Sequence, residues 1–129
     1  RHPGAADPVE HHSSRPDLQI LLYPVITMLG GGHGGSRTNL LGENPSAHLC
    51  ELLSNERQVS PHTPLCCLVR STQSLAVSVA DSDLYSAALK ENAVPCAYMR
   101  GEFGGHGFTL QDFWTVPCAE WLRRHRYAR

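Results

Sequence analysis

The sequence predicts an α/β fold built on a parallel sheet, and three observations lead to this class. Short apolar runs alternate along the chain with stretches that carry helix caps and helical spacing, an order that favours strands connected through helices. The apolar runs are continuous, which is typical of strands covered on both faces. With 129 residues, the chain has the length of one domain with a sizeable core.

The first strand is predicted over Gln19 to Ile26, where the run QILLYPVI is almost wholly apolar. Pro24 lies near its end, where the loss of a backbone donor is tolerable. Residues 1–17 are rich in Pro, His, Ser and charge, so we expect an irregular lead-in to this strand.

A glycine-rich segment and a first helix follow. Gly30 to Gly35 (GGGHGG) is expected to form a flexible loop around His33. Asn44 or Ser46 then caps a helix that runs to about Leu53.

The second strand is predicted over Leu65 to Val69, after two prolines that break the preceding segment. Asp81 or Ser82 is expected to cap the next helix, because short polar side chains accept hydrogen bonds from the first turn. Apolar residues at helical spacing carry this helix to about Asn92.

A third strand is predicted over Cys96 to Met99, directly after Pro95. A closing helix is expected from about Thr115 to Arg126, with Trp121 on its apolar face.

Composition excludes several classes of function. The formal net charge is −1, whereas nucleic-acid binders usually show a clear basic excess. No apolar run is long enough to span a bilayer, and no cofactor motif is present. Because the chain begins with Arg1 rather than Met, we expect a processed or truncated polypeptide.

Five cysteines are present, at positions 50, 66, 67, 96 and 118. An odd number leaves at least one thiol outside any intramolecular disulfide. Cys66 and Cys67 are neighbours in a predicted strand, so their side chains are expected on opposite faces of the sheet. Buried free thiols are therefore favoured over a disulfide framework.

The segment Gly104-Gly105-His106-Gly107-Phe108 is the most informative motif. Glycines leave an imidazole free to reach a partner elsewhere in the fold, and imidazole is the side chain best suited to proton transfer near neutral pH. The alternative is a glycine-rich turn that holds a solvated histidine.

Four stretches together resemble the C-terminal part of bacterial α/β-hydrolase-fold esterases. The similarity is to the acetyl-xylan and feruloyl esterase-like branch, which is related to prolyl-oligopeptidase-type hydrolases. The matching residues are 5–10 with 13–17 and 23–26, then 35–37 with 39–46, then 53–56 with 58–59 and 61–64, and finally 104–108 with Trp114 and Trp121-Leu122.

The resemblance implies a partial α/β-hydrolase fold, with the last three parallel strands and their covering helices. It places His106 as the catalytic histidine, which takes a proton from a serine nucleophile. The serine of the Gly-x-Ser-x-Gly elbow is absent from these residues. Residues 1–129 are therefore interpreted as the C-terminal portion of the domain, without the elbow half.

The expected catalytic acid is also missing. By resemblance Ser74 lies where the aspartate belongs, and a hydroxyl cannot stabilise an imidazolium as a carboxylate does. Asp81 and Asp83 are the nearest substitutes, although both are explained as acids at the start of a helix. Arg70 adds to this divergence, because a charge in a buried strand is costly unless paired.

The leading hypothesis is a truncated, inactive relative of serine carboxylic-ester hydrolases, which acts on an ester only if the missing half is supplied. The alternative is a non-catalytic interaction module, or a half-fold completed by another chain. In either case the edge strand Gln19 to Ile26 is expected to self-associate or to pair with a partner. A third hypothesis places a metal between His33 and His106, although two histidines alone make a weak site.

Overall fold

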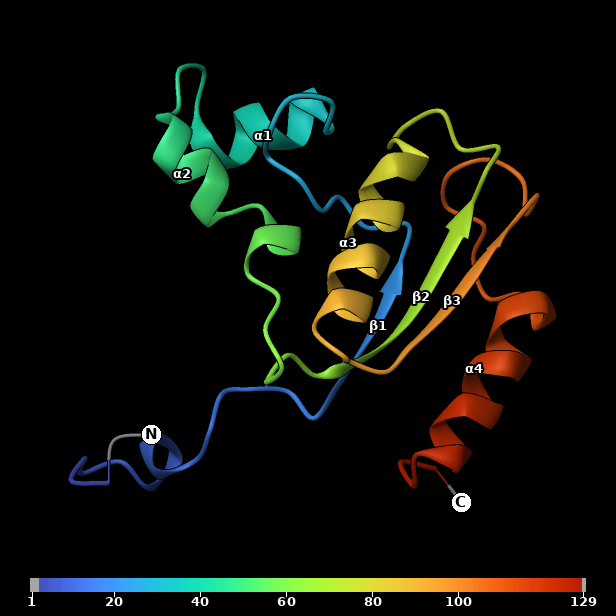
Figure 1. The fold of residues 1–129 in the computed structure, drawn as a ribbon. Helices are drawn as coiled ribbons and strands as arrows, with labels where there is room; N and C mark the ends of the chain where they lie inside the picture. Colours follow the sequence, from blue (N-terminus) through green and yellow to red (C-terminus); the bar gives the residue numbers. More distant parts are fainter. Residues whose placement is uncertain (1–2, 129) are drawn as a thin grey trace.

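A three-stranded parallel sheet forms the centre of the molecule in the computed structural model, which describes residues 3–128 (Figure 1). The strands, in spatial order, are β1 (Leu18–Leu22), β2 (Leu65–Ser71) and β3 (Cys96–Gly101). The central strand β2 pairs with both neighbours, with Leu65 opposite Leu18 and Cys66 opposite Cys96. The predicted α/β class with a parallel sheet is confirmed.

Helices cover both faces of this sheet. They are α1 (Gly34–Leu41), α2 (Ala47–Leu52), α3 (Val79–Glu91) and α4 (Asp112–Arg124), with the 3-10 turns η1 (Pro8–His11) and η2 (Asn55–Arg57). Figure 1 shows α3 on one face, α4 on the other, and α1 with α2 to one side of the sheet. Within residues 3–128, no helix is long and apolar enough to cross a membrane.

The core consists of two apolar clusters, one on each face of β2. On the α3 side, the buried members are Ile26, Cys66, Leu68, Tyr85, Leu89 and Val94. On the α4 side, they are Cys67, Val69, Trp114, Cys118 and Trp121. The side chains of consecutive β2 residues therefore alternate between the clusters, as the strand geometry requires, and the prediction for Cys66 and Cys67 is confirmed.

The first strand ends earlier than predicted. β1 stops at Leu22 instead of Ile26, because Tyr23 adopts a left-handed backbone conformation with φ of 40° and Pro24 has no amide to donate. Residues 23–26 continue from β1 as an irregular segment. Its end is fixed to η2 by a hydrogen bond from the Asn55 amide to the Ile26 carbonyl at 3.0 Å.

The expected loop at Gly30 to Gly35 is partly wrong, because α1 begins at Gly34. The cause is local: the His33 side chain accepts a hydrogen bond from the Ser36 amide at 3.1 Å and caps the helix. Such a cap satisfies one of the amides that the first helical turn leaves without a partner.

The other boundaries differ by a few residues. Ser46 caps α2 as predicted, but α3 begins at Val79 with Ser78 as its cap, so neither Asp81 nor Ser82 has that role. β2 and β3 run two residues further than expected, which places Arg70 and Arg100 inside strands. The closing helix α4 starts at Asp112, three residues before Thr115.

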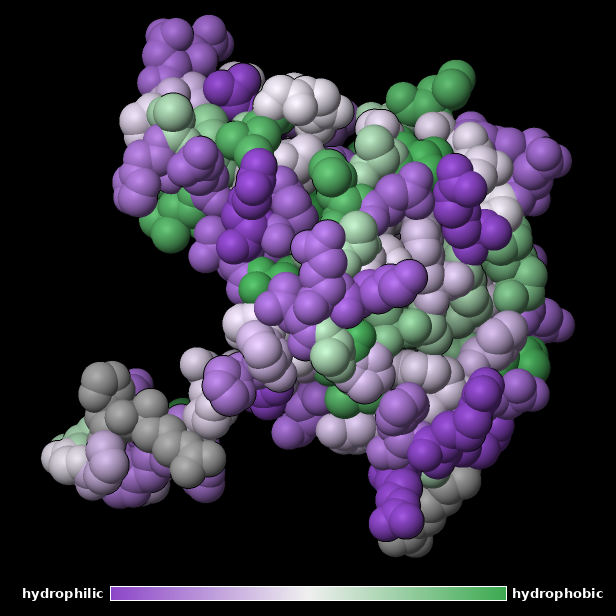
Figure 2. All heavy atoms as spheres, viewed as in Figure 1, coloured by the Kyte–Doolittle hydropathy of each residue, from purple (hydrophilic) through white to green (hydrophobic). Residues whose placement is uncertain are grey.

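The N-terminal lead-in contains one ordered turn, η1 at Pro8–His11, which Asp7 caps. The segment projects away from the remainder of the molecule (Figures 1 and 2). Residues 1 and 2 of the predicted lead-in lie outside the described residues.

Candidate active site

The carboxyl ends of β2 and β3 bring together two loops that are distant in sequence. The loop of residues 72–78 follows β2, and the loop of residues 102–111 follows β3. Ser74 Oγ lies 3.4 Å from His106 Nδ1. Ser74 is buried and the imidazole is exposed. The structure therefore joins the two positions that the resemblance assigns to the acid and the histidine, at the edge where ligands bind in open α/β sheets.

Hydrogen bonds from the first loop hold the histidine loop in place. The buried Ser71 hydroxyl donates to the Gly104 carbonyl and accepts from the Phe103 amide at 3.2 Å. The Gln73 side-chain carbonyl accepts from the Gly104 amide at 2.8 Å. Ser71 and Gln73 thus position the backbone at Phe103 and Gly104, just before His106.

Glycine is required on both sides of His106. Gly104 and Gly107 have φ of 86° and 82°, a left-handed region that side chains with a Cβ rarely adopt. The two residues turn the chain so that the imidazole lies beside Ser74. The expected role of the glycines was freedom of movement, whereas the structure shows that they are needed for two specific turns.

An aromatic side chain directly after β1 completes the surroundings of the imidazole. The Tyr23 ring lies against His106, with ring centroids 4.6 Å apart, and contacts Phe108 edge-on at 4.9 Å. Sequence reasoning did not assign Tyr23 to the site. The predicted strand ran to Ile26 and included Tyr23, so only the observed end of β1 at Leu22 places this ring at the carboxyl edge of the sheet.

Ser71→Ala is expected to loosen the histidine loop. The change removes the bonds to Gly104 and Phe103, which together are worth about 1–2 kcal/mol. Hydrogen exchange at the Phe103 amide should accelerate by roughly 5–30-fold. Gln73→Ala is the comparison, because it removes the bond to the Gly104 amide and leaves that of Phe103 intact. Equal exchange in Ser71→Ala and the parent would contradict this role of Ser71.

Neither suggested substitute acid is directed to His106. The Asp81 carboxylate is buried and accepts a hydrogen bond from the Thr27 amide at 3.3 Å. Asp83 accepts from the Tyr98 hydroxyl at 2.8 Å and lies 3.5 Å from Arg100. Both acids have partners away from the histidine loop.

Arg70 and Asp81 are buried charges with few partners. The Arg70 guanidinium donates to the Val77 carbonyl, while its Nε and Nη1 atoms have no hydrogen-bond partner among the described residues. Asp81 Oδ2 is likewise without a partner there. Burial lowers the pKa of Arg70 and raises that of Asp81. The bond from Arg70 fixes the end of the loop that carries Ser74, at a desolvation cost.

Asp81→Asn is expected to stabilise the chain at pH 7. Burial raises the pKa of the Asp81 carboxyl above its value in the unfolded chain, so the ionised form disfavours folding. This penalty grows as the pH rises through the unfolded and then the folded pKa, and it vanishes below both. Denaturant unfolding at pH 7 and at acidic pH tests this. A less stable variant at pH 7 would show instead that attraction to Arg70 outweighs burial.

The His33 side chain has a local structural role. Its Nδ1 atom lies 2.9 Å from the Ser36 hydroxyl, within the α1 cap. Among residues 3–128, no group of three or more His, Cys, Asp or Glu side chains is arranged to hold a metal ion. The structure therefore gives no support to a metal between His33 and His106.

Comparisons with known proteins identify the fold first. The fold matches that of a carboxylesterase from Lactobacillus plantarum, with a TM-score of 0.74 and 19% identity over 94% of this chain and 49% of the other. Esterase 2 from Thermogutta terrifontis gives a TM-score of 0.71 and 19% identity, with 97% and 48% covered. No family model matches the sequence.

Two other proteins have a higher sequence identity to this chain. An acetyl ester-xyloside bifunctional hydrolase from Caldicellulosiruptor lactoaceticus is 36% identical with a TM-score of 0.92, over 98% of this chain and 49% of that protein. Endo-1,4-beta-xylanase B from Butyrivibrio fibrisolvens is 39% identical over 100 residues, which are 78% of this chain and 16% of that protein. The chain spans about half the length of the solved structures it matches.

The chain is related to the α/β-hydrolase-fold esterases and corresponds to a C-terminal part of such a protein. Its three parallel strands and covering helices form part of the α/β-hydrolase fold.

Proposed function

We propose that this chain supplies the histidine half of a serine-type carboxylic-ester hydrolase site. His106 takes a proton from a serine nucleophile on another segment and returns it to the leaving alcohol. The observation that supports this role is the hydrogen-bonding distance of 3.4 Å between Ser74 Oγ and His106 Nδ1, at the carboxyl edge of the sheet. A partner at Nδ1 leaves the second ring nitrogen directed to the reacting groups.

The 129 residues alone are proposed to be inactive. They contain no Gly-x-Ser-x-Gly pentapeptide, and the nearest sequence, Gly34-Gly35-Ser36-Arg37-Thr38, departs from it at the last position. That serine lies in the first turn of α1, with its hydroxyl beside His33. Ser74 provides a neutral hydroxyl where a triad has a carboxylate, and the loss of that charge reduces turnover by several orders of magnitude.

The substrate class proposed for the complete site is an ester of a small acyl group on a xylose-containing sugar. The names of the two relatives with 36% and 39% identity describe an acetyl ester-xyloside hydrolase and a xylanase. The open surface around His106, lined by Phe103, Phe108 and Phe113, offers apolar area to such a group.

Hydrolysis of a short activated acetyl ester by the purified chain tests the proposed inactivity. The expected turnover equals that of the His106→Ala variant, since neither protein carries an activated serine. Turnover that His106→Ala abolishes would contradict the proposal and would require a nucleophile within residues 1–129. A serine-directed phosphonofluoridate gives an independent reading, because it is expected to leave the folded chain unlabelled.

A second candidate function is that of a non-catalytic half-fold completed by another polypeptide. β1 is an edge strand that pairs with β2 on one side only within the described part of the chain, and its Ile20 side chain is 41% exposed. Free backbone groups on an apolar edge favour association with another strand. Sedimentation should therefore show self-association or a complex. A sharp monomer with a cooperative thermal transition would contradict it.

A further inference from the structure

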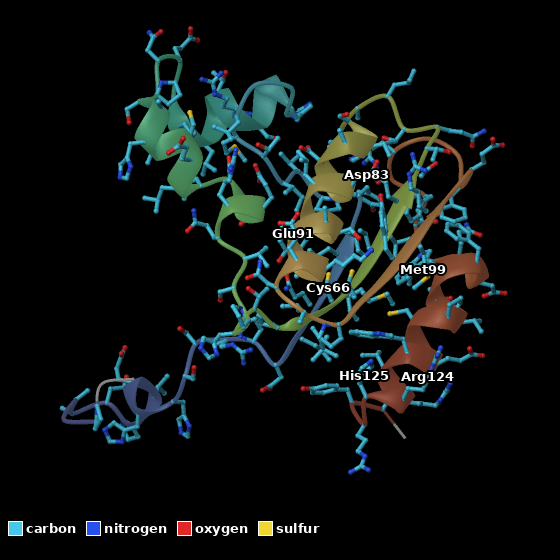
Figure 3. All side chains as sticks on the ribbon, viewed as in Figure 1. Cys66, Asp83, Glu91, Met99, Arg124 and His125 are labelled. Carbon is cyan, nitrogen blue, oxygen red and sulfur yellow. The ribbon has the colours of Figure 1, made fainter. Side chains whose placement is uncertain are left out.

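Two cysteines face each other across the central strand pair. Cys66 at the start of β2 lies directly opposite Cys96 at the start of β3, and Cys66 is labelled at that end of the sheet in Figure 3. Both side chains belong to the α3 side of the core, where Cys96 packs against the cluster that contains Cys66. Paired strands are about 4.8 Å apart, within the range of about 4.4–6.8 Å between Cα atoms that a disulfide spans.

A second pair of thiols lies on the other face of β2. Cys67 and Cys118 both belong to the α4 cluster. Both are closed to solvent, with exposures of 0% and 3%. This pair provides a comparison within the same molecule, because its two cysteines share one cluster but a reagent cannot reach either thiol from the surface.

Access distinguishes Cys96 from the other three thiols. Cys96 is partly exposed and lines a surface pocket together with Ser86, Lys90 and Val94, whereas Cys66 is fully buried. The neighbouring Cys66 thiol lowers the pKa of Cys96, and Cys96 raises that of Cys66. Lys90 places a cation in the same pocket, which also favours a thiolate there. Cys96 is thus the more reactive and the more accessible member of the pair.

We propose that Cys66 and Cys96 form a reversible disulfide, with Cys96 as the thiol that an oxidised glutathione-type disulfide reaches first. The Cys96 thiolate attacks one glutathione sulfur, the glutathione S–S bond breaks, and one glutathione thiolate leaves. The Cys66 sulfur then attacks Cys96 Sγ, its proton passes to the second glutathione, and that thiol leaves. The two cysteines are oxidised by two electrons, and one glutathione disulfide is reduced to two thiols.

The second step is favoured by the first. The side-chain interaction with Cys96 is the largest cause of the raised pKa of Cys66, ahead of burial, and the mixed disulfide removes the Cys96 thiolate from that interaction. Cys66 already lies opposite Cys96 in the strand register, so no large movement of either strand is needed. This site lies at the amino ends of the strands, opposite to His106, and does not depend on the proposed ester hydrolysis.

Peptide mapping of the complete chain tests the proposal. The folded protein is incubated with oxidised glutathione, free thiols are alkylated, and peptides are separated without reduction. The expected product links Cys66 to Cys96, is two hydrogen atoms lighter and reverts with dithiothreitol. Cys67 and Cys118 should stay reduced during the incubation and be recovered as alkylated cysteines when the protein is unfolded. Cys96→Ser should abolish the link, and Cys118→Ser, which disrupts the comparison pair, should retain it.

Four results would overturn the proposal. One is a glutathione adduct on Cys96 that persists without forming the link. Another is oxidation of Cys67 with Cys118 at the same rate, which would make surface access irrelevant. The third is a mixture of linkages among many cysteine pairs, because it would show that strand register does not select the partner. Absence of any reaction at Cys96 in the folded chain would equally refute its assigned access.

Discussion

Ser74→Asp is expected to raise ester hydrolysis by roughly 10²–10⁴-fold in a protein that combines this chain with a serine-bearing half of the fold. The Ser74 hydroxyl already lies 3.4 Å from His106 Nδ1. A carboxylate there accepts the Nδ1 proton, holds the required tautomer and stabilises the imidazolium that forms when the serine loses its proton. The partner half is the segment of the Caldicellulosiruptor hydrolase outside the match, which the resemblance predicts to carry the elbow.

Ser74→Asn is the matched control, because it has the size of aspartate without its charge. Equal gains in both variants would mean that side-chain length, and not charge, limits the site. The values of kcat and KM are measured separately, because a carboxylate that acts in the transition state should raise kcat. No gain in a folded Ser74→Asp protein would contradict the assignment of Ser74 to the acid position.

Trp121→Ala is expected to destabilise the chain by about 3–5 kcal/mol. Trp121 is 7% exposed and packs with Val69 and Cys67 in the cluster between α4 and the sheet. That loss is comparable with much of the stability of a small domain, so most molecules should unfold at physiological temperature. α4 also anchors the segment that precedes His106, through Phe113 stacked on Phe103 with centroids 4.1 Å apart. Loss of α4 packing should therefore disorder the site.

Val116→Ala on the same helix is the control, because this side chain is 51% exposed. Its effect should lie within about 0.5 kcal/mol. Denaturant unfolding of both variants gives the comparison. Similar stabilities would mean that α4 contributes little to the folded chain, contrary to the observed burial of Trp121.

Much of the fold was predictable because continuous apolar runs and helix caps are local signals. The second and third strands start at the predicted residues Leu65 and Cys96. The error at β1 has a local cause in the turn at Tyr23, since its left-handed conformation is unusual for a bulky side chain. α1 was missed because its sequence, GGSRTNLL, begins with two glycines and has no apolar stripe, so the His33 cap decides where it starts.

The site was predictable in part. The placement of His106 and Ser74 rested on the family resemblance, and their proximity follows from strands that end at one edge of the sheet. The roles of Ser71 and Gln73 were not predictable, because they bond to residues about thirty positions away, which no local pattern indicates. The contact of Tyr23 with His106 was not predictable for the same reason, because Tyr23 follows the first strand and His106 follows the last.

The central claim is that this chain carries the histidine of an ester hydrolase whose serine lies on another segment. The most direct test is hydrolysis of an activated acetyl ester by the combined protein described above, with and without His106→Ala. We predict turnover that exceeds that of either half alone and is lost in His106→Ala. Turnover that persists in a folded His106→Ala protein would contradict the claim.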